Sequence, residues 1–175
     1  MEQTQNLMPR PACIVATADV PAEVGQYPGS DEVMSEGRAV GRVAGLTRIG
    51  IHIERLPPGR RSTLPHAEED EEEFAYVLAG EVDCWLDGHL HRMRAGDFVA
   101  FAAGTGVCHT FINNGEYDAT LLIGGEASKA HNRIYYSHNP ERREQMAPGR
   151  WWDDVPPRDR GAHDGLPDAL RAMPG

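Results

Sequence analysis

Two histidines and two glutamates are spaced along the middle of the chain in a way that could hold a metal ion. His66 and Glu68 are two residues apart, so on a strand their side chains would point to the same side, about 6.6 Å apart along the backbone. Glu73 would follow on the next strand after a short acidic turn, and His109 on a later hairpin. Imidazole and carboxylate groups together suit Fe(II), Mn(II), Ni(II) or Zn(II). These four residues therefore predict a site for one divalent transition metal ion.

Glu68 has three possible roles: a fourth metal ligand, a hydrogen-bond acceptor or general base beside the ligands, or a solvated side chain. It opens a run of six acidic residues that ends at Glu73, and most of this run should be a hydrated turn. If the strand register slips by one, Glu72 replaces Glu73, because a slip reverses the two faces. For His66, Glu73 and His109 the alternative is a metal-free barrel lined by polar groups. Glu68 is the candidate catalytic residue, able to move a proton if it is not a ligand.

Two more polar residues are candidates for a substrate cavity. His52 lies on the strand face opposite three isoleucines at positions 49, 51 and 53, so it would line the cavity or lie on the surface. Asn113 shares a strand face with His109. It would orient a ligand or only close the turn that follows.

Short strand-like segments separated by glycine-rich turns fill residues 37–125. Residues 49–53 alternate with the period of a half-buried strand. Asp87 and Gly88 lie between two such segments and predict a tight hairpin, because both turn positions need positive φ. Further strands are expected at 74–78, 97–101, 109–112 and 120–123. This rhythm predicts an all-β sandwich or barrel.

The composition changes on both sides of the expected barrel. Residues 1–36 contain four prolines and no helical period, and predict an extended N-terminal arm. Residues 37–126 form the barrel. Residues 127–175 are rich in Pro, Arg and Asp but contain Tyr135-Tyr136 and Trp151-Trp152. Paired aromatic side chains bury large areas, so this tail is expected to be irregular and packed on the barrel.

Charge and cysteine content exclude several classes of function. The chain has 175 residues and a formal net charge of −10, and clustered Lys and Arg, which nucleic acids require, are missing. Anionic membrane surfaces are disfavoured for the same reason. The three cysteines have no CxxC spacing. No segment predicts a signal peptide or a membrane span. We therefore expect a cytoplasmic protein.

Two segments carry a resemblance to a known family: Pro58-Gly59, His66, Glu68, Glu73 and Gly80 in the first, and Gly96-Asp97, Gly104, His109 and Asn113 in the second. They resemble, in the right order, the two conserved motifs of the cupin superfamily, and the chain looks most like single-domain bacterial cupins. The resemblance implies a cupin fold, which is a double-stranded β-helix or jelly-roll barrel. Three departures are evident. Glu68 replaces the usual second His, Ala102 a common Pro, and His109 lies two residues later than the strict spacing.

The resemblance also carries expectations about function. Cupins include oxygenases, isomerases and lyases that act on small organic molecules, so a metal-dependent enzyme is one hypothesis. The alternative is a non-catalytic cupin that binds a sugar or organic acid, which the replacement at Glu68 favours. Cupins of this size are often homodimers. The segments before Gly37 and after Glu126 could cross to a partner.

Overall fold

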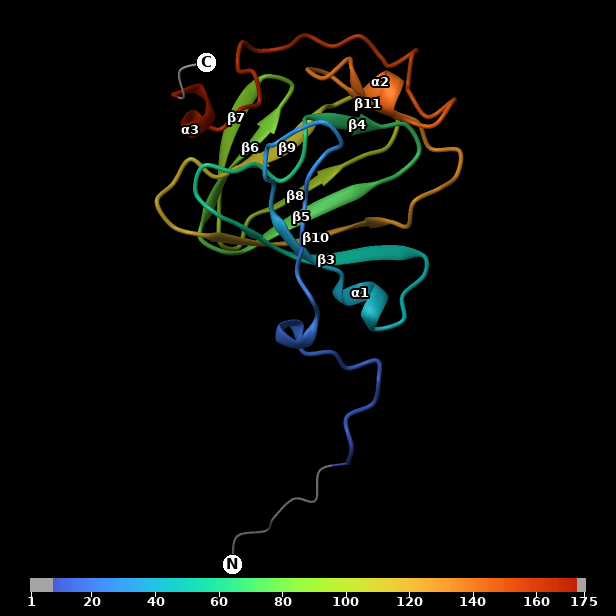
Figure 1. Ribbon diagram of the computed structural model, residues 1–175, viewed down its shortest axis with the longest axis vertical. Coiled ribbons are helices and arrows are strands. Elements are labelled where there is room, and N and C mark those ends of the chain that lie inside the picture. Colours follow the sequence, from blue (N-terminus) through green and yellow to red (C-terminus); the bar gives the residue numbers. More distant parts are fainter. Residues whose placement is uncertain (1–7, 173–175) are drawn as a thin grey trace, which may run out of the picture.

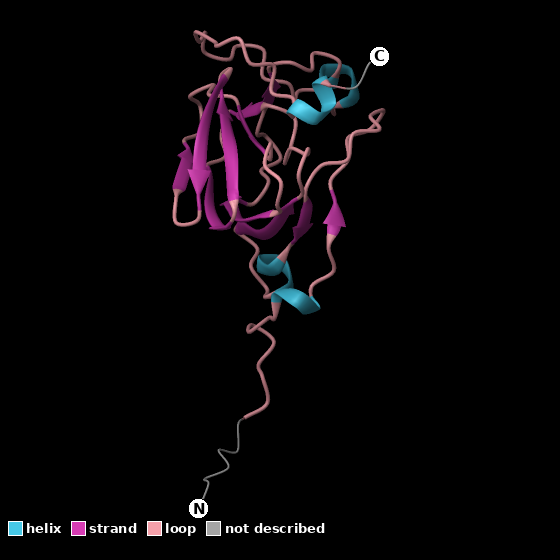
Figure 2. Ribbon diagram, turned by 90° about the vertical axis from the view of Figure 1, so that its left-hand side faces the viewer, coloured by secondary structure: helices cyan, strands magenta, loops and turns pink. Residues whose placement is uncertain are grey.

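The computed structural model of the protein describes residues 8–172, and its strands form two antiparallel sheets that face each other (Figure 1, Figure 2). The six-stranded sheet has the order β1 (Glu23–Val24), β2 (Glu36–Arg38), β3 (Ile49–Leu56), β10 (Ala119–Glu126), β5 (Glu73–Ala79) and β8 (Phe98–Phe101). The five-stranded sheet has the order β11 (Ile134–Tyr136), β4 (His66–Glu68), β9 (His109–Ile112), β6 (Glu81–Leu86) and β7 (His89–Arg94). The prediction of an all-β jelly-roll barrel is confirmed.

Helices in the described part of the chain are single turns. They are η1 (Thr17–Asp19), α1 (Val40–Val43), α2 (Arg142–Gln145) and α3 (Asp168–Arg171). Within residues 8–172, therefore, no helix is long and apolar enough to cross a membrane.

The tight turn between β6 and β7 follows directly from its sequence. Leu86 pairs with His89, so only Asp87 and Gly88 connect the two strands. Both residues have positive φ, at 44° and 89°, as a two-residue turn of this type requires. The predicted hairpin is thus present in the expected register.

The inward faces of four central strands change in character along the barrel. At one end β3, β5, β9 and β10 contribute buried apolar side chains, which meet those of β6, β7 and β8; we call this the apolar end. Its buried residues are Leu56, Ala75, Val77, Val82, Cys84, Met93, Phe101, Phe111, Ala119 and Leu121. At the other end β3, β5 and β9 turn His52, Glu54, Glu73 and His109 toward a cavity between the sheets. We call this the polar end.

The segment before Gly37 does more than extend from the barrel. Its β1 and β2 pair with each other, and β2 pairs with β3, which enlarges the six-stranded sheet. Met34 is only 1% exposed, and Glu32 forms a 2.7 Å ion pair with the buried Arg61. Residues 8–16, which precede η1, project away from the barrel (Figure 1).

The C-terminal segment lies across the five-stranded sheet. Its strand β11 pairs with β4, and Trp152 is buried against the barrel. Trp85 donates its indole N–H to the His163 carbonyl oxygen at 2.9 Å. Asp87, in the β6–β7 turn, forms an ion pair with Arg158. These contacts attach the tail from residue 134 to residue 163.

Candidate metal centre

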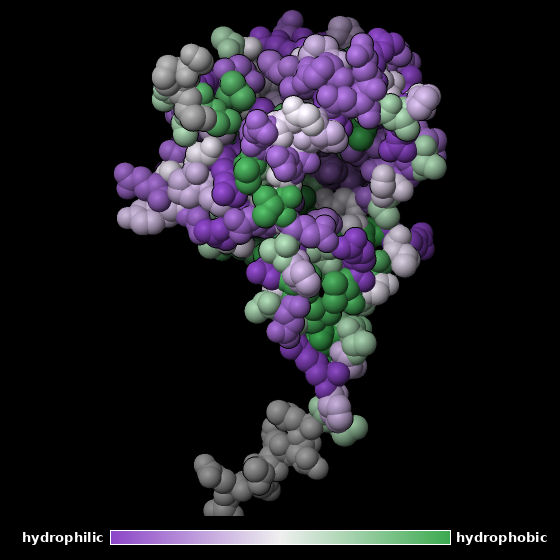
Figure 3. Space-filling model, viewed as in Figure 1, coloured by the Kyte–Doolittle hydropathy of each residue, from purple (hydrophilic) through white to green (hydrophobic). Residues whose placement is uncertain are grey.

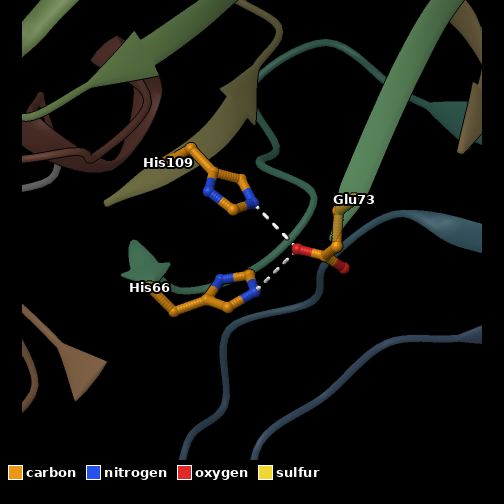
Figure 4. Close-up of side chains that lie close together, drawn as sticks. All are labelled: His66, Glu73 and His109. Carbon is orange, nitrogen blue, oxygen red and sulfur yellow. Dashed lines mark hydrogen bonds and ion pairs between the residues drawn. The ribbon is translucent and has the colours of Figure 1, made fainter. Parts of the chain in front are cut away.

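Three of the four predicted ligands come together at the polar end of the barrel. His66 and His109 are paired across β4 and β9, and Glu73 faces them from the first position of β5 in the opposite sheet. Glu73 Oε2 lies 3.1 Å from His109 Nε2 and 3.7 Å from His66 Nε2 (Figure 4). One ligand atom from each residue lies within 4.8 Å of the others. The two rings and the carboxylate therefore point at one common space.

Hydrogen bonds and ring contacts fix the orientation of both imidazoles. Nδ1 of His66 lies 2.9 Å from the Leu64 carbonyl oxygen, so it carries the proton that it donates there. Its Nε2 is then turned toward Glu73. The ring of His109 stacks on Phe101, with centroids 3.6 Å apart and planes 4° from parallel. Such support behind the ligating atoms is usual for metal-binding histidines.

The three groups shift one another's protonation. Burial alone would raise the pKa of Glu73, but hydrogen bonds from His109 and His66 outweigh burial and lower it. Burial lowers the pKa of His109. Burial also opposes the charged form of His66, yet the hydrogen bond and charge of Glu73 raise its pKa overall. Glu73 is thus an ionised carboxylate near neutral pH, and His109 is a neutral imidazole, which are the forms that bind metal.

Glu68 lies outside this close group. Its Oε2 accepts a hydrogen bond from Asn132 Nδ2 at 3.1 Å. Burial, together with the charge of Glu73, raises the pKa of Glu68 to about 8. Glu68 thus hydrogen-bonds to Asn132 instead of joining the close group, and its role as a ligand, an acceptor or a general base stays a prediction. Glu72, the substitute for Glu73 in a slipped register, is exposed.

The two cavity candidates lie in different places. His52 lines the cavity, although much of its ring is accessible to solvent, and burial followed by the charge of Arg42 lowers its pKa. Asn113 does not line the cavity. Its amide donates to the carbonyl oxygens of Leu56 and Tyr117, both at 2.8 Å, and it is 0% exposed. Of the two roles open to Asn113, the structure supports closing the turn.

Sequence reasoning missed one cavity residue, Glu54. It follows His52 by two positions on β3 and lines the same cavity. Ser35 Oγ donates a 2.7 Å hydrogen bond to Glu54 Oε2. Burial is the main cause of the raised pKa of Glu54, and the charge of Glu73 adds to it. The alternation that singled out His52 applies equally to Glu54, so the sequence did contain this signal.

The cavity has a volume of about 220 Å³ and opens to solvent. Besides the polar residues described above, its wall contains apolar side chains: Phe74, Phe101, Phe111 and Ile123. Two imidazole nitrogens and a carboxylate at this separation suit a divalent transition metal. Three protein donors also leave coordination positions for water or another molecule. The residues present fit a metal ion.

Comparison with known proteins supports the resemblance to a known family. The sequence profile of the cupin domain matches residues 52–124, the segment from β3 to β10 that contains all three ligand candidates. This segment is similar to a cupin domain, in agreement with the jelly-roll fold. No curated protein has significant sequence similarity to it.

Solved structures with the same fold include several bacterial proteins. A sugar phosphate isomerase of the cupin superfamily from Silicibacter pomeroyi is 29% identical, with a TM-score of 0.65 over 71% of this chain and 81% of that one. A polyketide cyclase from Streptomyces resistomycificus is 24% identical, with a TM-score of 0.59 over 80% and 94% of the two chains. A predicted oxalate decarboxylase from Thermotoga maritima is 22% identical, with a TM-score of 0.55 over 66% and 99%. The last two similarities establish the fold alone.

Proposed function

We propose that the protein is a metal-dependent enzyme that acts on a small organic molecule by oxygenase, isomerase or lyase chemistry. The convergence of His66, Glu73 and His109 from two facing sheets in one open cavity supports this most directly. A divalent Fe, Mn, Ni or Zn ion held there would supply Lewis-acid or redox chemistry to a substrate oxygen. The chain's own groups would bind and orient the substrate beside it.

Each residue of the site has a defined part in this proposal. His66 and His109 would bind through Nε2, and Glu73 would supply a negatively charged donor. Phe101 holds the His109 ring in place by stacking. Glu68 is the proposed proton carrier, because it lies two residues after His66 on the same strand, β4.

Isomerisation is the first reaction to assay. The structure with that description, from Silicibacter pomeroyi, is 29% identical over most of its length. The decarboxylase and the cyclase are more distant in sequence, at 22% and 24% identity. The isomerase, decarboxylase and cyclase reactions all remain candidates for this protein. The order of the later assays should be chosen according to the metal found in the purified protein.

Elemental mass spectrometry of the purified, untagged protein tests the metal site. About one equivalent of Fe, Mn, Ni or Zn per chain is expected, and the double variant His66→Ala/His109→Ala should lose it, because both imidazole donors are removed. The double variant His89→Ala/His91→Ala, on β7, is the matched control and should keep its metal. Unchanged stoichiometry in the first variant would refute the site.

A non-catalytic binding cupin is the alternative. It is favoured by Glu68, which stands in place of a family histidine and is hydrogen-bonded to Asn132 instead of joining the close group. Protein that holds no metal even after reconstitution, yet is stabilised thermally by a small metabolite, would support this function over the enzyme.

We also propose that the protein is a homodimer. Three apolar side chains on the outer face of the six-stranded sheet are substantially exposed: Tyr76 by 36%, Leu78 by 45% and Phe98 by 60%. Tyr76 and Phe98 are paired across β5 and β8, so the patch is continuous. Sedimentation of wild type and Phe98→Asp is the test. A monomeric wild type, or an unchanged dimer in the variant, would contradict this surface.

A further inference from the structure

The cavity beside the metal site continues into a second compartment. The metal chamber is the cavity of about 220 Å³ that contains His66, Glu73 and His109. The outer chamber, of about 380 Å³, is lined by residues of the segment from Glu23 to Ala39. Four residues line both chambers: His52, Glu54, Ser62 and Thr63. The chambers therefore adjoin, and a recess with many hydrophilic side chains around it is visible on this side of the molecule (Figure 3).

No lysine or arginine among the described residues lines either chamber. Two nearby arginines are in ion pairs: Arg42 pairs at 3.1 Å with Glu23, a residue of the outer chamber, and Arg61 pairs with Glu32 at 2.7 Å. Phosphate and carboxylate ligands are normally held by such side chains or by the N-terminus of a helix. Within residues 8–172, these chambers therefore offer an anion no lysine or arginine side chain.

The carboxylates leave no excess positive charge after metal binding. A divalent ion brings two positive charges; the carboxylate of Glu73 balances one, and that of Glu54 balances the other when it is ionised. Both line the metal chamber, and the histidines beside them add no charge when neutral. At the rim Glu126 adds another carboxylate, which pairs with Lys129 at 2.8 Å. An anionic ligand would therefore enter a site without net attraction for it.

Neutral polar groups are plentiful where the chambers meet. Ser62 and Thr63 lie on the shared wall, and Gln26, Tyr27 and Ser35 line the outer chamber. Aromatic side chains form much of the rest of the metal chamber, among them Phe74 and Phe111. Apolar walls with a few well-placed hydrogen-bonding groups are typical of sites for small uncharged molecules.

We propose that the two chambers together bind an uncharged small molecule rich in hydroxyl or carbonyl groups, and that Glu54 excludes phosphorylated and carboxylated compounds. The proposal rests on the proposed function for its metal-bound end, and it narrows the substrate class of that site. Glu54 acts as a specificity-determining residue. Its carboxylate accepts from Ser35 and lies where a molecule would pass between the chambers.

Orthophosphate is the probe for the charge argument. Phosphorus NMR titrations would compare metal-loaded wild type, Glu54→Gln and Glu36→Gln. The Gln at position 54 keeps an oxygen for Ser35 but removes the charge, so orthophosphate affinity should rise at least about tenfold. The control removes one charge from the adjacent strand β2, where Glu36 pairs with Arg55 outside both chambers, and should leave the affinity unchanged. Equal affinity in all three proteins, or tight binding by wild type, would overturn the role of Glu54.

A set of small compounds balanced for charge tests the chambers directly. Saturation-transfer NMR would be run on wild type, Gly37→Leu and Glu36→Leu. A Cβ at Gly37 would lie 3.8 Å from Glu54 Oε1 and 3.9 Å from His52 Nδ1, so a leucine there adds volume at the junction without a backbone clash. Glu36→Leu adds the same side chain one residue earlier, outside both chambers.

Compounds that bind wild type and Glu36→Leu but not Gly37→Leu are the ones held in the chambers. We expect uncharged hydroxyl or carbonyl compounds to be most of them. The proposal would be refuted if most of these compounds were anions, or if Gly37→Leu abolished the binding of no compound. Metal content measured on the same samples distinguishes failure of the proposed enzyme function from failure of the proposed substrate class. Samples without metal would contradict the proposed enzyme, whereas anion binding would contradict the substrate class.

Discussion

The apolar end and the polar end of the barrel are built from the same strands, yet they serve opposite purposes. On β3 the inward side chain of Leu56 is fully buried in the core, while Glu54 and His52, two and four residues earlier, line the cavity. On β9 the step from Phe111 to His109 is the same change over two residues. Strand alternation fixes which residues face inward. The identity of those residues then divides the barrel into an apolar half and a half lined by titratable groups.

The difference between the two ends predicts which substitutions should destabilise the fold and which should instead impair metal binding. Apolar contacts and the closing of turns hold the fold, whereas buried titratable groups are costly to bury and are kept for what they bind. Substitutions at the apolar end should change the free energy of unfolding and leave metal binding intact. Substitutions at the polar end should do the reverse.

The largest effect on stability is expected from Leu121→Ala. Leu121 is 0% exposed in the core, and removing such a side chain costs about 3 kcal/mol through lost burial and the cavity left behind. Urea unfolding measures this change, and metal content of the folded variant should equal that of wild type. Leu122→Ala is the matched control on the outer face. A loss below about 1 kcal/mol for Leu121→Ala would show that the core adapts.

Asn113→Ala should be the next most damaging. The variant leaves the carbonyl oxygens of the buried Leu56 and of Tyr117 without their donor, at a cost of about 2 kcal/mol. Metal content should not change, because Asn113 does not line the cavity. Asn114→Ala, at the neighbouring turn position, should cost less. Loss of metal in Asn113→Ala at full stability would instead return this residue to the ligand-binding role.

His109→Asn should have the opposite profile. The stability of the metal-free protein is expected to change by about 1 kcal/mol, the size of one hydrogen bond, while bound metal falls to near zero. Unfolding curves with chelator and elemental analysis without it measure the two quantities. His91→Asn on β7 should change neither. If His109→Asn retains one equivalent of metal, the prediction that the polar end holds the metal ion is wrong.

The last prediction concerns the pH dependence of stability. Burial, together with the charge of Glu73, raises the pKa of Glu68 from its ordinary 4.5 to about 8. Between these values the folded state holds a proton that the unfolded state has lost, so metal-free wild type should lose stability as pH rises through this window. Glu68→Gln should be flatter over the same range when unfolding is followed at several pH values. If the stability of wild type and of Glu68→Gln changes with pH in parallel, the pKa of Glu68 in the folded protein lies near its ordinary value.

Much of the barrel and the core of the site could be predicted from local patterns. Strand alternation and motif spacing are short-range properties, and they were enough to single out His66, Glu73 and His109 and the hairpin at Asp87-Gly88. Strand alternation places Glu54 on the same face as His52. Alternation alone does not reveal whether that face borders a cavity or solvent, and Glu54 was therefore missed.

The remaining features depend on contacts between distant parts of the chain. Glu68 is held by Asn132, 64 residues further along, and no local pattern reveals such a partner. The same holds for β1 and β2, which belong to the sheet because of their pairing with β3. Long-range pairing decides which irregular segments become part of the fold, and a single sequence does not encode it in any local period.

The pairing of β4 with β11 has a consequence for the order in which the protein is made. His66 is paired with Tyr136, so the strand that carries a metal ligand gains its outer neighbour only after about 70 more residues have been added. Until the ribosome has released that segment, β4 is an unprotected edge held through its other neighbour, β9. Contacts so far apart in the chain form slowly. A nascent chain would thus complete its barrel before the group of candidate metal ligands is fully enclosed.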